Sequence, residues 1–451
     1  MTTLRTLNQL SAELHSGRTT SATLVDQALV RAEDPHGEGE RVFIERYVDQ
    51  ARAGAEAADT LRTAGVRRSP IDGLPISIKD LFDYTGSITR GGSVALDDAV
   101  PAHANAVVVN RLIAAGAVIV GRTNMTEFAY SGLGINPHYG TPRNPWDRAT
   151  GRIPGGSSSG AAISVTDGMA AAAIGSDTGG SVRIPAALCG LTGFKPTARR
   201  VSMQGVQPLS PSLDSIGPIA PSVACCAVLD ALLAGEPVRV PQPAQLKGLR
   251  LAVPTDVALD GMDDAVSTAF AATLKRLRAA GVQISEIPVP AFSKLASINA
   301  AGGFTASEAW AYHRKLIGTH GTHYDPRVVS RIKRGEGMSA ADYIDLLAAR
   351  RAWIAEVDAT LAPFDALIMP TVPVVAPEIS ALTASDDTYF AANGAMLRNP
   401  TLINFLDGCA LSVPCHAPGD APVGLMISGS AGADKRVLGI GLAVEAVLAT
   451  R

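Results

Sequence analysis

The sequence lacks a strong net charge of either sign and any long hydrophobic run. Its 451 residues carry 39 Lys and Arg against 42 Asp and Glu, which gives a formal net charge of −3. Without a dense basic run there is no electrostatic footprint for nucleic acid, so we expect no nucleic-acid partner. No apolar run reaches the ~20 residues that span a bilayer, and no signal peptide follows Met1, so we expect no membrane partner.

Cysteine is scarce as well. Five cysteines, an odd number in a long chain, favour reduced thiols in the cytoplasm over a disulfide framework. Cys225 and Cys226 fall on an apolar helical pattern and are expected to pack in the core. Cys189 is expected to be a packing residue rather than a nucleophile. His320 and His323 lack a third ligand motif, so the sequence predicts no metal site and no cofactor.

The residues that are present predict an α/β layered fold. Apolar residues make up 47% of the chain and charged residues 18%, which is enough for a sizeable core. Residues 3–63 have helical patterns, residues 105–121 predict a helix, a glycine stop and a buried strand, and residues 248–284 predict strand, helix, strand. This alternation is typical of helices layered on a sheet.

Two turns of small residues, 155–160 and 178–181, bracket an apolar stretch at 161–174 that predicts a short helix and then a buried strand. Glycines let the backbone adopt positive φ angles and approach a ligand closely, and both turns also carry hydroxyl groups. From composition alone, two ordinary loops explain the pattern equally well. The second turn is more specific, because residues 181–188 are able to begin a helix there.

Ser181 is the candidate nucleophile of the second turn. The N–H groups of Thr178, Gly179, Gly180 and Ser181 are placed to converge on an oxyanion, where one donor is typically worth ~2.7–4 kcal/mol. A serine hydroxyl is a weak nucleophile until a base takes its proton. Because no Gly-x-Ser-x-Gly elbow surrounds Ser181, the base need not be histidine.

Lys79 is the candidate base. It ends a short apolar strand that follows a turn at Gly73, and a lysine in such a place is either paired or made neutral by desolvation. Neutral lysine is a competent general base. The alternative is a salt bridge to Asp80 or to another acid at the strand end. Arg183 is interpreted as structural, holding an acid near the turn such as Asp177.

Together these motifs resemble the signature of the amidase signature family. The resemblance rests on the serine-rich turn, the Asp-Thr-Gly-Gly-Ser turn, the Ile-Lys-Asp of residues 78–80, and the 24-residue separation of Ser157 from Ser181 (181 − 157 = 24). Further similar stretches are residues 123–128, 143–147, 193–197 and 213–218. The similarity is dense over residues 70–220 and loose in the flanks.

The resemblance implies a Ser-Ser-Lys triad. Ser181 matches the nucleophile, Ser157 the bridging serine that follows a cis peptide bond, and Lys79 the base that receives the proton through Ser157. Thr178, Gly179 and Gly180 then fall on the oxyanion-hole turn.

The resemblance also implies a single domain over residues 1–451, an α/β/α fold around a large mixed, mostly parallel twisted sheet. Within it we expect N-terminal helices at 1–65, the signature core at 66–225, and a peripheral α/β and helical part at 245–451. A homodimer is the arrangement most common in the family. We expect Ser131, Gly132 and Ile184 to line the substrate site, with apolar Ile184 offering no charged anchor for an acidic substrate.

The expected reaction is hydrolysis of a carboxamide C–N bond of a small molecule through a seryl acyl-enzyme, releasing ammonia or an amine. One alternative is the glutaminase subunit of a tRNA-dependent amidotransferase, favoured by residues 143–147 and the Ser-Asp-Thr-Gly-Gly-Ser turn. Against it, Leu81, Phe82 and Asp83 follow Asp80 where that subunit usually has asparagine, and residues 300–400 do not resemble its glutamine-binding half. A non-catalytic binding protein is the alternative of another class.

Overall fold

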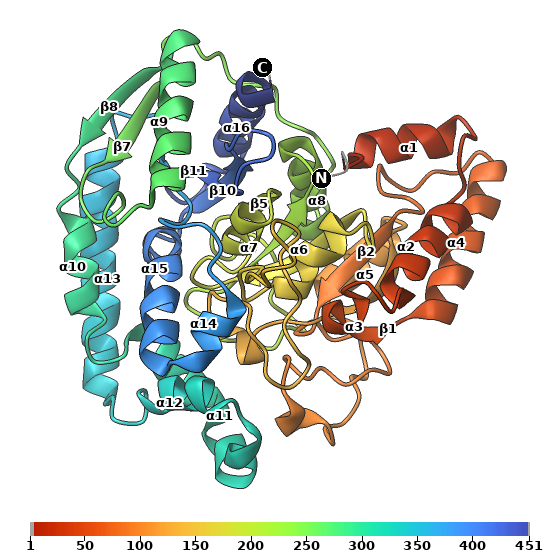
Figure 1. Ribbon diagram of the computed structural model, residues 1–451, viewed down its shortest axis with the longest axis horizontal. Coiled ribbons are helices and arrows are strands. Elements are labelled where there is room, and N and C mark those ends of the chain that lie inside the picture. Colours follow the sequence, from red (N-terminus) through yellow and green to blue (C-terminus); the bar gives the residue numbers. More distant parts are fainter. Residues whose placement is uncertain (1–3, 450–451) are drawn as a thin grey trace.

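A computed structural model describes residues 4–449 as helices layered on both faces of one sheet (Figure 1). The sheet has eleven strands, and its order brings strands from the start and the end of the chain into one layer. The single α/β domain around a large mixed sheet is therefore confirmed. In sheet order the strands are β1 (Phe43–Arg46), β3 (Val118–Thr123), β2 (Pro75–Lys79), β4 (Ala172–Asp177), β6 (Ser215–Ala220), β5 (Thr192–Lys195), β10 (Cys409–Pro414), β11 (Gly424–Gly429), β9 (Ala366–Pro370), β7 (Arg250–Pro254) and β8 (Gln283–Ile287).

The expectation that the sheet is mostly parallel is wrong, because four strand pairs are parallel and six are antiparallel. Parallel pairs join β2 to β3 and β4, and join β7 to β8 and β9. The other six pairs are antiparallel. The sequence pattern missed β5, β6 and β10, and these strands supply most of the antiparallel pairs in the middle of the sheet. Antiparallel neighbours do not need the helical crossover that the alternating pattern predicts.

Two sets of helices cover the sheet. The first packs on β3 and β4 and comprises α2 (Ser21–Glu33), α3 (Gly39–Val42), α4 (Val48–Thr63), α6 (Ser159–Thr166) and α7 (Arg183–Leu188). The second packs on the opposite face and comprises α1 (Leu7–His15), α5 (Val107–Ala114), α8 (Val223–Ala234), α9 (Asp264–Ala279) and α16 (Asp434–Ala449).

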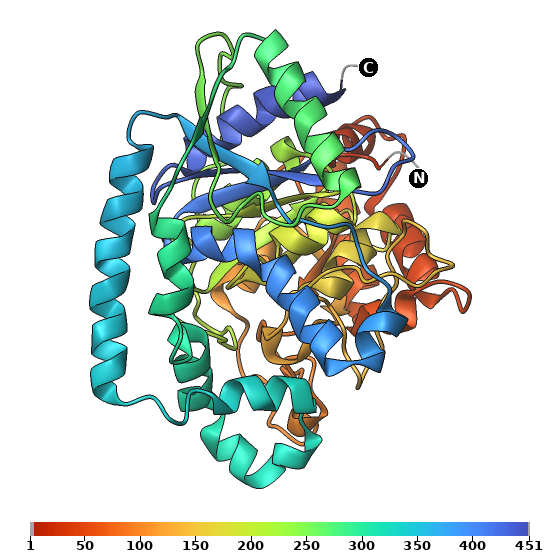
Figure 2. The ribbon, with the colours of Figure 1, turned by 60° about the vertical axis from the view of Figure 1, so that its left-hand side comes forward.

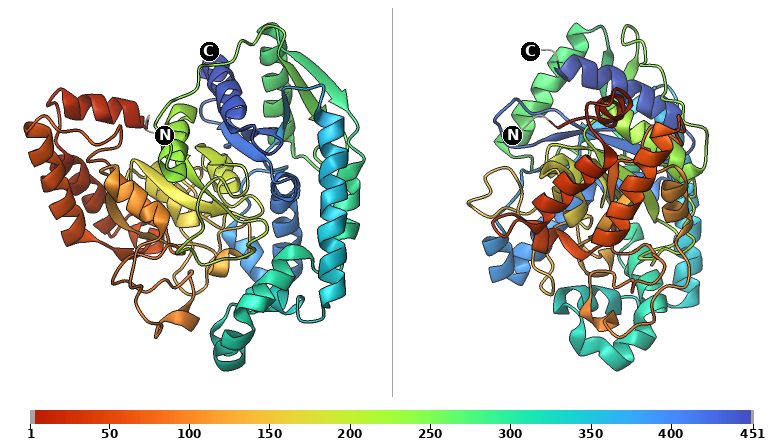
Figure 3. Two further views of the ribbon diagram at one scale, coloured as in Figure 1. Left: turned by 180° about the vertical axis from the view of Figure 1, so that it is seen from behind. Right: turned by 90° about the vertical axis from the view of Figure 1, so that its right-hand side faces the viewer.

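A third group of helices follows β8 along the chain. Two of them, α10 (Ala291–Ile298) and α13 (Ala340–Leu361), lie at the β7–β8 end of the sheet, far from the N-terminal helices (Figures 1 and 3). The long α13 runs along this end, and α11 and α12 lie below it (Figure 2). The group comprises α10 (Ala291–Ile298), α11 (Gly303–His320), α12 (Pro326–Lys333), α13 (Ala340–Leu361), α14 (Ile379–Ala384) and α15 (Asp386–Phe405). Short 3-10 turns occupy Val94–Leu96, Glu127–Ala129 and Gly321–His323.

The N-terminal part holds one element that the helical pattern did not predict. β1 interrupts the helices and pairs with the edge of the sheet at β3. It has only four residues, which is too short for a recognisable alternation of apolar and polar side chains. The helical interpretation of residues 3–63 is thus wrong at this strand, and the sheet runs without a break through all three expected parts of the chain.

The parallel pairing of β2 with β4 positions the candidate site. Ile78 of β2 lies opposite Ile174 of β4, so the carboxyl ends of both strands meet at one edge of the sheet. Every residue of the two strands is buried, as expected for central strands covered on both faces. Among residues 4–449, no helix combines the length and apolar character needed to cross a membrane.

Candidate active site

Lys79 closes β2 and extends its amine toward two serines. Its Nζ donates hydrogen bonds to Ser157 Oγ at 2.7 Å and to Ser176 Oγ at 2.9 Å. Lys79 and Ser157 have no exposed surface, and Ser176 is buried as well. The lysine is therefore held by neutral hydroxyl groups in a dry environment.

Burial lowers the pKa of Lys79 from 10.5 to about 7, while the charges of Asp177 and Asp214 act in the opposite direction. The alternative of a salt bridge to Asp80 is wrong, because the Asp80 carboxylate instead pairs with Arg122 at 3.0 Å. Desolvation disfavours the ammonium form, so a large share of Lys79 is neutral near pH 7. Lys195 is also buried, but within residues 4–449 its amine donates to two backbone carbonyls, those of Pro196 and Gly408, and to no serine.

The two serine-bearing turns meet beside this lysine. The peptide bond between Gly156 and Ser157 is cis, as the resemblance implies. The N–H of Ser158 donates to the carbonyl oxygen of Ser181 at 3.3 Å, which joins the first turn to the second. Within residues 4–449 the Ser181 hydroxyl has no hydrogen-bond partner, and it lies on the wall of a cavity.

The second turn wraps around the carboxylate of Asp177. Gly180 donates its N–H to Asp177 Oδ1 at 2.8 Å, so this donor is already engaged. In the described part of the chain, the N–H groups of Thr178, Gly179 and Ser181, which follow the end of β4, have no acceptor. Gly180 has a φ of 120°, and a Cβ there would lie 2.5 Å from Pro400, so glycine is required for the close approach.

The Arg183 side chain stabilises the second turn through Asp177. It forms a buried ion pair with Asp177, with Nη2 2.8 Å from Oδ1 and Nε 3.0 Å from Oδ2. The same guanidinium donates to Asn404 Oδ1 at 2.6 Å. Although burial raises the pKa of Asp177, the charge of Arg183 and its hydrogen bonds lower it below the ordinary range. The structural interpretation of Arg183 is confirmed.

Asp214 supports the turn from the side. Its Oδ1 accepts the Thr178 hydroxyl at 2.5 Å, and its Oδ2 accepts the N–H groups of Leu209 and Ser210. Burial nevertheless raises the pKa of Asp214 to about 7. The pKa values of this carboxyl and of Lys79 both lie near 7, so the charges of the two groups change over the same pH range.

Ser181 opens onto a cavity of about 460 Å³. The wall brings residues of the second turn together with side chains from the third group of helices. It comprises Ala129, Tyr130, Ser131, Thr178, Gly179, Ser181, Leu209, Leu213, Val257, Phe292, Ser293, Leu295, Ala296, Asn299, Gly302, Phe304, Thr305, Arg331, Gly394, Leu397, Arg398, Thr401, Leu402 and Phe405.

Of the three residues expected to bind substrate, Ser131 lies on this wall. Its hydroxyl donates to Asn393 Oδ1 at 2.9 Å, and the N–H of Gly132 donates to the same oxygen at 2.8 Å. Ile184 has no exposed surface and packs behind Gly132, where its Cδ1 would lie 3.2 Å from an added Cβ. Gly132 and Ile184 therefore lie behind the cavity wall.

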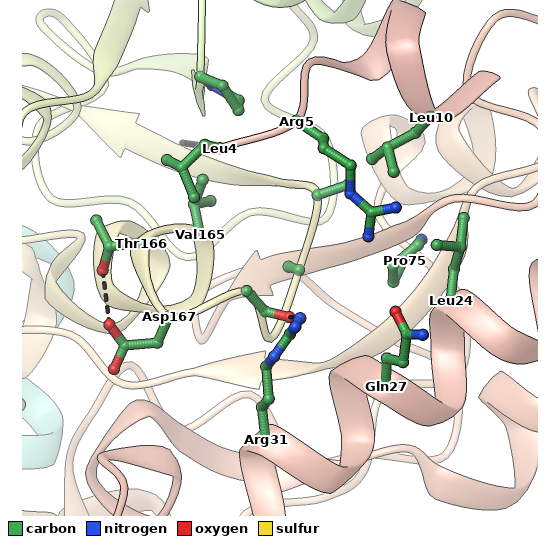
Figure 4. Close-up of a pocket in the computed structure, with 14 residues that line it drawn as sticks. Leu4, Arg5, Leu10, Leu24, Gln27, Arg31, Pro75, Val165, Thr166 and Asp167 are labelled. Atoms are coloured by element: carbon green, nitrogen blue, oxygen red, sulfur yellow. Dashed lines mark hydrogen bonds between the residues drawn. The ribbon is translucent and has the colours of Figure 1, made fainter. Parts of the chain in front are cut away.

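A second cavity, of about 220 Å³, lies at the amino ends of β2 and β4, opposite to the end that carries Lys79. Figure 4 shows Arg5 and Arg31 reaching it from different sides. The Arg31 guanidinium donates to the carbonyl of Gly168, and Arg5 pairs with Glu13. None of the predicted site residues lines this cavity.

The cysteines and histidines lie outside the site. All five cysteines are free. Cys189 is buried, burial raises the pKa of its thiol, and Sγ donates to the carbonyl of Pro154 at 3.3 Å. In the part of the chain that the structure describes, no group of three or more His, Cys, Asp or Glu side chains could hold a metal ion.

The fold and this sequence signature define an amide hydrolase of the amidase signature type. A family model described as Amidase matches residues 24–438, and the chain belongs to that family of hydrolases acting on C–N bonds. A 2-amino-5-chloromuconic acid deaminase of Comamonas testosteroni is 37% identical over 404 residues, covering 88% of this chain and 87% of the relative. One subunit of the glutamyl-tRNA(Gln) amidotransferase of Roseiflexus sp. is 34% identical, covering 98% of this chain and 96% of the relative.

Solved structures agree. A crystal structure of an amidase superposes with a TM-score of 0.87 at 32% identity, covering 98% of this chain and 99% of that one. An inhibitor-bound complex of an s-triazine catabolic enzyme superposes with a TM-score of 0.88 at 30% identity, covering 98% of both chains. The peptide amidase of Stenotrophomonas maltophilia gives a TM-score of 0.82 at 27% identity, covering 99% and 97%.

Sequence reasoning missed two residues of the site. One is Ser176, the second acceptor of the Lys79 amine. The pairing of β2 with β4 could have identified it, because Ile78 lies opposite Ile174 and Ser176 is two residues further along β4, on the same face of the sheet as Ile174. Arg331 reaches the cavity from α12, more than a hundred residues away along the chain. No local pattern marks it.

Proposed function

We propose that this chain is an amidohydrolase that cleaves the carboxamide C–N bond of a small molecule through an acyl-enzyme on Ser181. The observation that carries the proposal is the buried hydrogen bond from Lys79 Nζ to Ser157 Oγ, at 2.7 Å, beside a turn with free N–H donors. A lysine with its pKa near 7 and no carboxylate partner is suited to accept a proton.

In the first half-reaction the Ser181 hydroxyl turns toward Ser157 and attacks the amide carbonyl carbon. Its proton passes to Ser157, whose own proton passes to neutral Lys79. The N–H groups of Thr178, Gly179 and Ser181 receive the oxyanion; Gly180 is left out because its N–H is held by Asp177. The C–N bond then breaks, and the leaving nitrogen takes a proton back along the same relay.

In the second half-reaction water attacks the Ser181 ester. The relay removes a proton from the water and returns one to the Ser181 oxygen, so the acid leaves and the enzyme is restored. This chemistry proceeds with the chain's own side chains. The 460 Å³ cavity suits a small amide, and its wall is mostly apolar.

The proposal is tested by ammonia or amine release from a panel of aliphatic, aryl and urea-type amides, with the protein purified alone. We expect wild type to hydrolyse members of the panel and Ser181→Ala to be inactive. Ser267→Ala, on α9 and outside the cavity, is the matched control and keeps full activity. Intact mass spectrometry on a quenched reaction locates the acyl group; an acyl group on any residue other than Ser181 contradicts the mechanism.

A glutaminase subunit of an amidotransferase is the second candidate, because the amidotransferase relative aligns over 98% of this chain. We propose instead that the chain needs no partner subunit of another kind and works as a homodimer. Activity that appears only when a different partner protein is added favours the glutaminase. Light scattering gives the number of chains in the active species.

A non-catalytic binding protein is the remaining alternative. In that case the wild-type protein would bind amides and hydrolyse none of them. The presence of Lys79, Ser157 and Ser181 in one buried cluster argues against it, because a binding protein has no need of a desolvated lysine.

A further inference from the structure

Arg331 on α12 brings a positive charge to the cavity without a counter-ion. Its Nη1 donates to the carbonyl oxygen of Tyr130, and its guanidinium lies 4.4 Å from the centre of the Tyr130 ring. Among residues 4–449, Arg331 forms no ion pair, and the titratable groups nearest to it are the neutral phenols of Tyr130 and Tyr389 and the like charge of Arg334. Burial lowers the pKa of Arg331, but an arginine stays protonated in proteins.

The amino end of α11 opens onto the same cavity. This 18-residue helix begins at Gly303, and no side chain caps its first turn. Gly302, Phe304 and Thr305 line the cavity. In the described chain the N–H groups of Gly303, Phe304 and Thr305 have no acceptor, so the positive end of the helix dipole faces this space.

The wall around these groups is mostly apolar, with the side chains of Leu209, Leu213 and Leu295 among its members. A second arginine, Arg398, also lines the cavity, and its guanidinium donates to the carbonyl oxygen of Asp260 at 2.5 Å. Arg331 is half-buried, and a cation in mostly apolar surroundings is stabilised when an anion pairs with it. Two independent features therefore favour a negative charge at one place in the cavity: a guanidinium without an ion-pair partner among residues 4–449, and an uncapped helix start.

We propose that Arg331 and the first turn of α11 form an anion subsite, and that the substrate is an amide that carries a carboxylate. This inference rests on the proposed function. The planar guanidinium matches the two oxygens of a carboxylate, and helix N–H groups bind the same oxygens. Because Ser181 and Arg331 share one small cavity, the amide and the carboxylate belong to one short molecule, such as the monoamide of a dicarboxylic acid.

The first test compares wild-type kcat/KM on pairs of amides that differ only in charge. The anionic members are malonamate, succinamate and glutaramate, and the neutral members are malonamide, succinamide and glutaramide. A hydrogen bond between charged groups strengthens binding about 10- to 100-fold. We therefore expect kcat/KM to be about 10- to 100-fold higher for the anionic amide than for the neutral amide in at least one of the three comparisons. Neutral members that match or exceed the anionic ones in every pair overturn the inference.

The second test removes the cation. Arg331→Met is expected to lose the preference for the anionic amide while its kcat/KM on the neutral diamide stays within about threefold of wild type, because the apolar stem is kept. Lys333→Met removes an exposed cation from the same helix and keeps the preference. An equal loss on both members by Arg331→Met, in a protein with normal melting, contradicts the subsite. Where Arg331→Met does not fold, the wild-type comparison decides.

A binding measurement separates the two proposals. Titration calorimetry with malonate, succinate, glutarate and adipate needs no turnover, and we expect a Kd that Arg331→Met weakens at least tenfold. If wild type binds a dicarboxylate in this way yet hydrolyses no amide, the anion subsite stands and the proposed function fails. If neutral amides are hydrolysed and no dicarboxylate binds, the function stands and the subsite fails.

Discussion

The pH dependence of the reaction tests whether the Lys79 amine is the base. Burial lowers its pKa from 10.5 to about 7. At pH 8 a lysine with the lowered value is ~90% neutral, whereas one with the ordinary value is ~0.3% neutral. The structure thus makes about 300 times more base available at pH 8 than an exposed lysine would supply.

The assay is kcat/KM for ammonia release between pH 5 and pH 9. Protonation of the Lys79 amine removes the base, so the rate is low in acid and rises with pH. The lowered pKa places this rise near pH 7. We expect a plateau above pH 8, half of it at about pH 7, and a tenfold fall for each unit below, down to ~1% of the plateau at pH 5. A rate that keeps rising tenfold per unit through pH 9 would refute the reasoning, because it places the base at the ordinary lysine pKa.

Substitution of the lysine provides the control. Lys79→Met keeps the apolar stem, removes the amine, and is expected to lower kcat about 10²- to 10⁴-fold, the usual contribution of a general base. Circular dichroism at each pH shows that the protein stays folded over the range used. A variant that is folded and keeps wild-type kcat excludes Lys79 as the base.

Three further predictions concern the groups around the base. Ser157→Ala should lower kcat at least 100-fold in steady-state assays, whereas the neighbouring Ser159→Ala, whose hydroxyl faces backbone, keeps most activity. Asp214→Asn removes a negative charge that raises the lysine pKa, so the acid limb should move to lower pH; an unmoved limb would exclude this coupling. Arg183→Lys loses part of the buried pair with Asp177 and should cost up to about 3–5 kcal/mol in urea unfolding, with lower activity; wild-type stability and rate would contradict the role assigned.

The contact of Lys79 with the serine-rich turn could be predicted from the sequence because its determinants are local. Lys79 ends a short apolar run that follows a turn, and the glycines and hydroxyls of residues 155–160 and 178–181 lie next to one another along the chain. These short stretches fix their own backbone conformation, and the fold needs only to bring three of them together. The lysine–serine contact at 2.7 Å is what the resemblance led us to expect.

The specificity part was not predictable in the same way. Arg331 and the start of α11 meet the catalytic turn only in the folded chain, and a lone arginine in a charged helix has no distinguishing pattern. Ile184 misled the prediction for the converse reason: it is close to Ser181 in sequence but packs behind Gly132. The pairing of β5, β6 and β10 was likewise set by tertiary contacts rather than by local alternation.

Asn404 joins the turn of residues 178–181 to α15, and this bears on how specificity can change. Asn404 of α15 accepts from Arg183 at 2.6 Å and donates to Asp177 Oδ1 at 2.9 Å, so α15 is bonded directly to the carboxylate that shapes the oxyanion turn. In the part of the chain that the structure describes, the Arg331 guanidinium donates to the Tyr130 carbonyl and forms no hydrogen bond to that turn. We therefore expect a change at Asn404 to alter the chemistry and a change at Arg331 to alter the choice of substrate.

This asymmetry predicts opposite kinetic signatures for two variants. Asn404→Ala should lower kcat by a similar factor for every amide that wild type hydrolyses, because it loosens the turn and leaves the anion subsite intact. Arg331→Met should change the ratio between anionic and neutral amides and leave the neutral rate near wild type. If Asn404→Ala shifted substrate preference with an unchanged kcat, Asn404 would act in substrate recognition, and the division between chemistry and specificity drawn from these hydrogen bonds would be wrong.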